Sequence, residues 1–401
     1  MKFLIVSDVH AISEEFSKLP DDYGYHGEDG SGFRIESRTK ADNRILAIGE
    51  CLKEQKGQID VLVCLGDFAH QAKKLVLLQV WHDLHDVAKQ LEIPTVIGIT
   101  GNHDIATRIE DIQGAESRVE FLKQIKPSYP TSDAHLSDGY HRNGVGTCEV
   151  DGCLLVALDT CMLHGLGEDK EKSQKIWSVG HLTENMIEKT MDAIDATACN
   201  HVFVMMHHHP LKIDDIVDQH YDQMSNGPRF LELLGNSNKN CFIAHGHKHL
   251  VNLKKAPIGV RPAVLLSSAS LAAYPYRGQD SHFSNQFHLL DFDMSENTRP
   301  QGEILSWDWG ASRWEESKKH DMPHVKKFGP AIDMGDIEKK LKSVPIVGYL
   351  NRIKLLEAVP EVEYLSLDEV EEINKRLEPT DREIIHRQSQ VSGMMLQGEV
   401  L

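Results

Sequence analysis

Residues 94–104 read PTVIGITGNHD, an apolar run that ends abruptly in a glycine and three polar side chains. The run has the length and the β-branched content of a buried strand. Gly101 permits a sharp turn, and Asn102, His103 and Asp104 follow at once. A plain turn before a helix would have the same composition. Polar groups at the end of a strand are nevertheless where α/β sheets place ligands.

Four other apolar runs end in the same way. They lead into Asp8-Val9-His10, Gly66-Asp67, His207-His208-His209-Pro210 and Gly246-His247-Lys248-His249. Residues two apart leave a strand on the same side, so each D-x-H or H-x-H pair points one way. If the five strands belong to one sheet, these side chains meet at one rim.

Each motif alone is weak. A lone D-x-H is mostly structural or incidental, Gly-Asp is a common turn signal, and G-H-x-H alone fits an isolated zinc pair. Five such motifs, each after a predicted strand, are a far more specific signal. Carboxylate and imidazole without thiolate suit Mn, Fe or Zn rather than Ca or Mg alone.

The order of these motifs resembles the signature of the calcineurin-like metallophosphoesterase superfamily, over about residues 1–310. The resemblance implies two divalent metal ions, with Mn²⁺ expected and Fe, Zn or Ni as alternatives. Asp67 would bridge the two ions. Counting back from Pro210 to the family's H-H-P motif selects His208, and His207 is the alternative. The implied metal ligands are Asp8, His10, Asp67, Asn102, His208, His247 and His249.

The resemblance also implies a mechanism, in which hydroxide shared by the two metals attacks phosphorus in line. His103 would contact the phosphate or protonate the leaving oxygen, and Asp104 would orient His103. Asn102 would help to hold the developing charge. His70 either reaches the substrate or is only a helix-start residue. Further candidates for the mouth of the site are Tyr274, Tyr276 and Arg277.

Strand-like and helical segments alternate along the chain, which predicts an α/β fold: a two-sheet mixed β-sandwich flanked by helices. The predicted strands are 3–7, 60–65, 94–100, 153–159, 201–206 and 240–244, and the predicted helices are 42–54, 73–91 and 183–197. Runs at 263–268, 286–292 and 303–309 lack helices between them and predict a meander that closes a second sheet. The polar segment 11–40 is predicted to be a loop over the site or a disordered insertion.

The predicted domains are a catalytic domain at 1–314 and a small helical C-terminal appendage at 315–401. Apolar residues at helical spacing predict helices in the appendage; they are Ile337, Leu341 and Val344, then Val370, Ile373 and Leu377. Thr380 and Glu383 have the spacing of a capping box and predict one more short helix.

Composition limits the remaining possibilities. The chain has 401 residues and a formal net charge of −18, which disfavours partners that need a basic surface. Its seven cysteines form no C-x-x-C pair, so reduced thiols are expected. The apolar start of the chain lacks a cleavage site, and no run is long enough to span a membrane. A cytoplasmic protein without a membrane partner is therefore expected, and a homo-oligomer stays open.

The predicted function is a dinuclear-metal phosphoesterase that hydrolyses a phosphodiester or phosphomonoester. The acidic charge favours a small nucleotide or a cyclic nucleotide-type diester. The alternative is a DNA-repair-type exonuclease of the same superfamily, which the chain length and the appendage favour. The minor alternative is an inactive scaffold that binds a protein partner, and it is disfavoured because every ligand position is filled.

Overall fold

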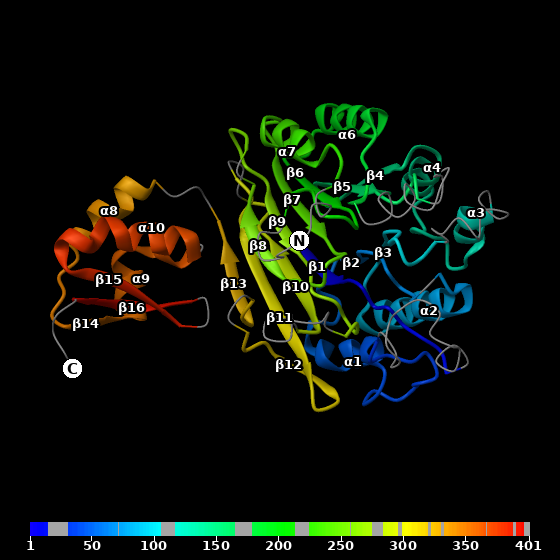
Figure 1. Cartoon of the computed structure of the whole chain (residues 1–401), viewed down its shortest axis with the longest axis horizontal. Helices are drawn as coiled ribbons and strands as arrows, with labels where there is room; N and C mark the ends of the chain where they lie inside the picture. Colours follow the sequence, from blue (N-terminus) through cyan, green and yellow to red (C-terminus); the bar gives the residue numbers. More distant parts are fainter. Residues whose placement is uncertain are drawn as a thin grey trace.

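The computed structural model shows three β-sheets and their helices (Figure 1). It describes residues 1–14, 31–70, 72–105, 117–164, 179–212, 224–256, 258–274, 284–295, 299–319, 322–329, 333–365, 367–387 and 390–396.

The first sheet contains the N-terminal strand. Its members are β1 (Lys2–Val6), β2 (Val61–Cys64), β3 (Thr95–Gly98), β10 (Gln286–Phe292), β11 (Gly302–Gly310), β12 (Arg313–Glu316) and β13 (Val325–Phe328). The order is β12-β11-β10-β1-β2-β3, and β13 pairs with β11. β1, β2 and β3 run parallel, whereas β10 is antiparallel to β1.

The second sheet faces the first. It contains β4 (Val145–Val150), β5 (Cys153–Leu158), β6 (His201–Met205), β7 (Asn240–His245), β8 (Asn252–Lys255) and β9 (Val264–Ser267). The order is β4-β5-β6-β7-β9-β8, with β5, β6, β7 and β9 parallel. The Phe3 ring on β1 stacks on the Phe203 ring on β6 with centroids 4.1 Å apart, so the two sheets form a sandwich.

Helices cover the outer faces of the sandwich (Figure 1). They are α1 (Arg44–Cys51), the 3₁₀ turn η2 (Lys53–Gln55), α2 (Lys74–Leu91), α3 (Ser117–Gln124), α4 (Ala134–Asn143), α6 (Glu184–Ala196) and α7 (Gly227–Gly235). β6 is buried on both faces: Phe203 belongs to the layer between the sheets, and Val204 belongs to the layer under α6 and α7. The continuous apolar strands of the sequence are explained by this burial on two sides.

The predicted fold class is confirmed, with two corrections to its topology. The motif-bearing strands do not share one sheet, because β1, β2 and β3 lie in the first sheet and β6 and β7 lie in the second. The predicted meander does not close the second sheet either. β10 and β11 extend the first sheet from β1, and β9 joins the second. Most of the predicted insertion at 11–40, residues 15–30, lies outside the described residues.

The C-terminal unit has its own hydrophobic core, which includes Ile337, Leu355 and Ile373. Its elements are α8 (Met334–Ser343), β14 (Tyr349–Asn351), α9 (Arg352–Ala358), η4 (Pro360–Tyr364), α10 (Leu367–Leu377), η5 (Glu378–Thr380), β15 (Arg382–Arg387) and β16 (Gln390–Leu396). The helix predicted from Thr380 and Glu383 is wrong: this segment is a 3₁₀ turn followed by β15, which pairs with β16.

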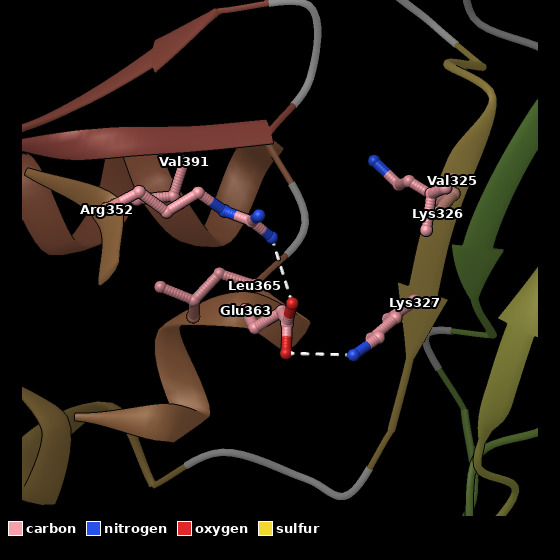
Figure 2. Close-up of a pocket in the computed structure, with 7 residues that line it drawn as sticks. All are labelled: Val325, Lys326, Lys327, Arg352, Glu363, Leu365 and Val391. Atoms are coloured by element: carbon pink, nitrogen blue, oxygen red, sulfur yellow. Dashed lines mark hydrogen bonds and ion pairs between the residues drawn. The ribbon is translucent and has the colours of Figure 1, made fainter. Parts of the chain in front are cut away.

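The boundary between the two parts lies later in the chain than the predicted 314. β13 pairs with β11 through Phe328, so the first sheet continues to that residue. Figure 2 shows the junction, where Glu363 on η4 lies between Lys327 on β13 and Arg352 on α9. Its carboxylate accepts hydrogen bonds from Lys327 at 3.1 Å and from Arg352 at 2.9 Å. Lys255 and Glu369 form a second ion pair between the two parts, at 3.2 Å.

Candidate active site

Five strand ends from the two sheets meet at one edge of the sandwich. The turns that follow them hold unusual backbone conformations: Asp8, His10, Asp67, His247 and His249 all have positive φ, between 47° and 83°. Residues other than glycine seldom adopt this region, and such strain persists where surrounding structure enforces it. Five of the side chains that the sequence singled out thus lie on strained backbone.

One group of donors consists of Asp8, His10 and His249, all buried. The Nε2 atoms of His10 and His249 lie 3.0 Å apart. His249 Nε2 is 3.4 Å from Asp8 Oδ1, and His10 Nε2 is 3.4 Å from Asp67 Oδ2. Ser7 Oγ donates to Asp8 Oδ2 at 2.5 Å and so helps to fix this carboxylate.

A second group of donors consists of Asn102, His207 and His247. Asn102 Oδ1 lies 3.0 Å from His207 Nε2 and 3.0 Å from His247 Nδ1. His207 Nε2 is also 3.4 Å from Asp67 Oδ2. Asp67 Oδ2 therefore lies at the same distance from the ring nitrogen of His10 in the first group and from that of His207 in the second.

The contacts favour His207, the alternative from the sequence, over His208. The Nδ1–H of His207 donates to the Leu65 carbonyl at 2.8 Å, which leaves Nε2 with a lone pair directed at the cluster. Metal-binding histidines are commonly oriented by such a bond. His208 Nδ1 instead contacts the Thr160 hydroxyl at 2.9 Å, although a ring nitrogen of His208 also lies within 4.8 Å of ring nitrogens of His207 and His247. The sequence held a usable signal, because Asp8, His207 and His247 are each the second residue after their strand.

Asp104 has a different environment from the one predicted. Its Oδ2 accepts the backbone N–H of Asp67 and of Gly101, both at 2.8 Å. Its Oδ1 accepts the N–H of Phe68 at 2.7 Å and of Ala69 at 3.3 Å. Both oxygens are thus engaged by the backbone of two motif turns, and these contacts favour a role for Asp104 in organising the turns over the predicted role of orienting the His103 ring.

Two glycines let these turns approach one another closely. A Cβ at Gly101 would lie 2.2 Å from Asp67 Oδ1 and 2.3 Å from the Asp67 nitrogen. A Cβ at Gly246 would lie 2.5 Å from Asp8 Oδ2. No side chain fits at either place without displacing a carboxylate of the cluster.

His103 and His70 lie at the rim. Both are partly exposed, and their rings stack with centroids 5.5 Å apart. The His103 ring also meets the His10 ring edge-on at 4.7 Å, while its backbone N–H donates to Asp67 Oδ1 at 2.7 Å. The structure thus brings His70 to the cluster. Tyr274 is 49% exposed, whereas Tyr276 and Arg277 lie outside the described residues.

Burial controls the protonation of the cluster. It lowers the pKa of the His10, His103 and His247 imidazoles. Burial also lowers the pKa of His207, but the Asp67 carboxylate outweighs this effect and raises the pKa to about 9. Although burial opposes the ionisation of Asp67, His207 and His103 hold its pKa well below the usual range. Without a metal ion, the ionised Asp67 thus lies beside a protonated His207 and otherwise neutral imidazoles, and a cation bound at His207 Nε2 would replace that proton.

The donor set fits a pair of divalent cations. Imidazole nitrogens 3.0 Å apart repel unless they share a proton or a cation. Every donor is oxygen or nitrogen, which suits Mn, Fe, Zn and similar ions. Asp8, His10 and His249 would hold one ion, and Asn102, His207 and His247 the other, with Asp67 between them.

A two-sheet sandwich that gathers such donors at its strand ends defines the metallophosphoesterase fold. Residues 1–251 match the family model for calcineurin-like phosphoesterases. The chain therefore belongs to the calcineurin-like phosphoesterase family. Residues 327–379 match a second model, a winged helix-turn-helix domain associated with calcineurin-like proteins. Comparison with curated proteins finds no match.

The solved structures to which the chain is similar are distant from it. A purple acid phosphatase from yellow lupin (Lupinus luteus) seeds is 11% identical, with 79% of this chain and 52% of that chain covered and a TM-score of 0.44. A 5'-nucleotidase precursor from Thermus thermophilus is 13% identical, with coverages of 78% and 56% and a TM-score of 0.39. The chain thus spans little more than half the length of these two relatives.

Two predictions from composition can be compared with the structure. All seven cysteines are free, and five of them are buried, as expected for reduced thiols. Among the described residues, no helix is long and apolar enough to cross a membrane.

Proposed function

We propose that this protein is a dinuclear-metal phosphoesterase. The observation that carries the proposal is the position of Asp67 Oδ2, which lies 3.4 Å from a histidine nitrogen in each of the two donor groups. A shared carboxylate oxygen of this kind is suited to bridge two ions. We further propose the ligand set Asp8, His10, Asp67, Asn102, His207, His247 and His249.

Two bound divalent ions would supply Lewis-acid chemistry, polarising the phosphoryl oxygens and lowering the pKa of water. The residues at the rim supply the rest. Since Asn102 directs its oxygen at His207 and His247, its N–H group remains to donate to a phosphoryl oxygen. His103, partly exposed beside the cluster, donates a ring proton to the leaving oxygen, because the negative charge of a bound phosphate ester would offset the burial that lowers its pKa. His70 stacks on His103 and confines the substrate from the same side.

The proposed substrate is a small nucleotide-type phosphodiester. A net charge of −18 disfavours long polyanions, because the field of the protein repels them. The winged helix-turn-helix match favours the second candidate, a nuclease. Its helix α10 has the sequence LDEVEEINKRL, with four acidic and two basic residues. That composition opposes contact with a phosphate backbone. The scaffold alternative is disfavoured because no donor is lost.

The test is a substrate screen with the purified full chain and added Mn²⁺. The substrates are bis-p-nitrophenyl phosphate, p-nitrophenyl phosphate, cyclic nucleotides and linear DNA. We expect hydrolysis of the small diesters, its loss with EDTA and its recovery when Mn²⁺ is restored. The Asp67→Asn variant should be inactive, whereas the control Asp138→Asn, which changes an exposed surface carboxylate, should match the wild type. Full activity in chelator would refute the mechanism, and turnover of DNA alone would favour the nuclease.

A further inference from the structure

A second cavity lies beside the N-terminal end of α1. Its lining includes Arg34, Asp42, Arg44, Tyr274, Trp309 and Ser312. None of the seven proposed metal ligands lines it. The cavity is therefore distinct from the donor cluster, although one connection links the two. Leu271 donates its N–H to the carbonyl of Ser7, next to Asp8, and its own carbonyl accepts a hydrogen bond from Arg44.

Arg44 is the unusual group in this cavity. The residue is 8% exposed, and its Nη1 donates to the Leu271 carbonyl at 3.0 Å. Its guanidinium carbon lies 5.3 Å from the centre of the Trp309 ring. Within the described part of the chain, its buried Nε has no hydrogen-bond partner and no carboxylate forms an ion pair with it. A buried cation with an unsatisfied donor is costly unless a partner arrives.

The surroundings hold the guanidinium in place as a cation. A Cβ at residue 32 would lie 2.3 Å from Arg44 Nη2 and 3.6 Å from the Tyr274 ring, so only Gly32 admits the guanidinium at this position. Burial lowers the pKa of Arg44 to about 10, which still leaves it charged at neutral pH. Asp42, the acid in the lining, accepts a hydrogen bond from the Thr39 hydroxyl at 2.6 Å.

We propose that this cavity binds a phosphate monoester dianion. Arg44 lines the cavity with a cationic guanidinium, whose N–H groups are donors that phosphate oxygens accept. Arg34 adds a second cation from another part of the lining, and Ser312 adds a hydroxyl. The half-exposed Tyr274 ring gives a flat surface for an aromatic base, so a nucleoside monophosphate should bind more tightly than inorganic phosphate.

The experiment is isothermal titration of the full chain with inorganic phosphate and with AMP. An Asp67→Asn background removes anion binding that depends on the metal cluster, so the result does not depend on whether the chain is a phosphoesterase. We expect both ligands to bind this background. Adding Arg44→Gln should weaken both by about tenfold or more, the effect of losing a charge-assisted hydrogen bond.

Three further variants complete the design. Arg34→Gln, at a partly exposed position, tests the same cavity if Arg44→Gln does not fold, and it should also weaken both ligands. Tyr274→Ala should weaken AMP and leave phosphate unchanged. Lys53→Gln, the same loss of charge on the exposed surface after α1, should change neither. The proposal is overturned if neither ligand binds the Asp67→Asn chain, or if both arginine variants bind as the background does.

Discussion

The Asp104→Asn variant tests what the last residue of the GNHD motif does. In the structure four backbone N–H groups donate to its carboxylate, two to each oxygen, at 2.7–3.3 Å. Asparagine keeps one oxygen and replaces the other with an N–H donor. Whichever way the amide is turned, two of the four bonds are lost and two backbone donors face another donor.

The size of the effect follows from these contacts. Burial and the neighbouring Asp67 carboxylate raise the pKa of Asp104 to about 8, so the carboxyl group is partly protonated at neutral pH. A hydrogen bond contributes about 0.5–1.5 kcal/mol with a neutral acceptor and about 1.5–3 kcal/mol with a charged one, so losing two lowers the free energy of unfolding by about 1–6 kcal/mol. Asp104 is 6% exposed, so water cannot replace the lost partners. The N–H donors include those of Asp67, a proposed metal ligand, and of Gly101, which directly precedes the proposed ligand Asn102. We therefore expect lower metal content together with lower stability.

Urea unfolding measures the stability, and elemental analysis measures the metal. Asp138→Asn is the matched control, because that carboxylate pairs with Arg142 on the surface and should change stability by less than about 1 kcal/mol. If Asp104 instead orients His103, Asp104→Asn will lose turnover while keeping wild-type stability and metal. That result would refute the role derived from the backbone contacts.

Three other predictions follow from the site and the fold. His207→Ala should lose one of two metal equivalents and nearly all diester turnover, whereas His208→Ala should keep both metals in elemental analysis. The opposite result would show that His208, which the H-H-P motif before Pro210 selects, is the ligand. His103→Ala should keep metal but lower kcat by roughly 10²–10⁴, and less for p-nitrophenolate than for poorer leaving groups; an equal loss for all leaving groups would indicate phosphate positioning. The fragment 1–329 should fold and bind metal, whereas 1–319 lacks β13 and its buried phenylalanine and should be less stable by about 3–5 kcal/mol in urea; equal stability would show that β13 is not part of the core.

The strand ends that carry the motifs were predictable because each strand is apolar on both faces. A strand that is buried on both faces is a continuous run of apolar residues, and the first polar residue after the run marks the end of the strand. The partner of each strand was not predictable in the same way. β10 pairs with β1 across nearly the whole domain, and nothing local distinguishes it from a strand of the second sheet.

The roles of individual polar residues were harder to predict than their positions. From the sequence GNHD alone, Asp104 could equally well orient the His103 ring or organise the turn. The difference arises only when the turn carrying Asp67 packs against it. Strand β13, with the sequence VKKF, was missed because a partly exposed edge strand with lysines lacks a clear alternation. The pattern at Thr380 and Glu383 was overridden by pairing between β15 and β16.

The charge of the C-terminal unit bears on the choice between the two proposed substrate classes. In helix-turn-helix proteins a recognition helix enters the major groove, where positive charge is favoured beside the DNA phosphates. Helix α10 is instead net negative, with four acidic and two basic residues. Its Glu369 forms an ion pair with Lys255 on β8 of the sandwich. Glu363 on η4 holds Lys327 on β13 in the same way. Two acidic residues of the unit, Glu363 and Glu369, are thus paired with lysines of the sandwich, which fits a unit that stays against the sandwich better than one that reads DNA.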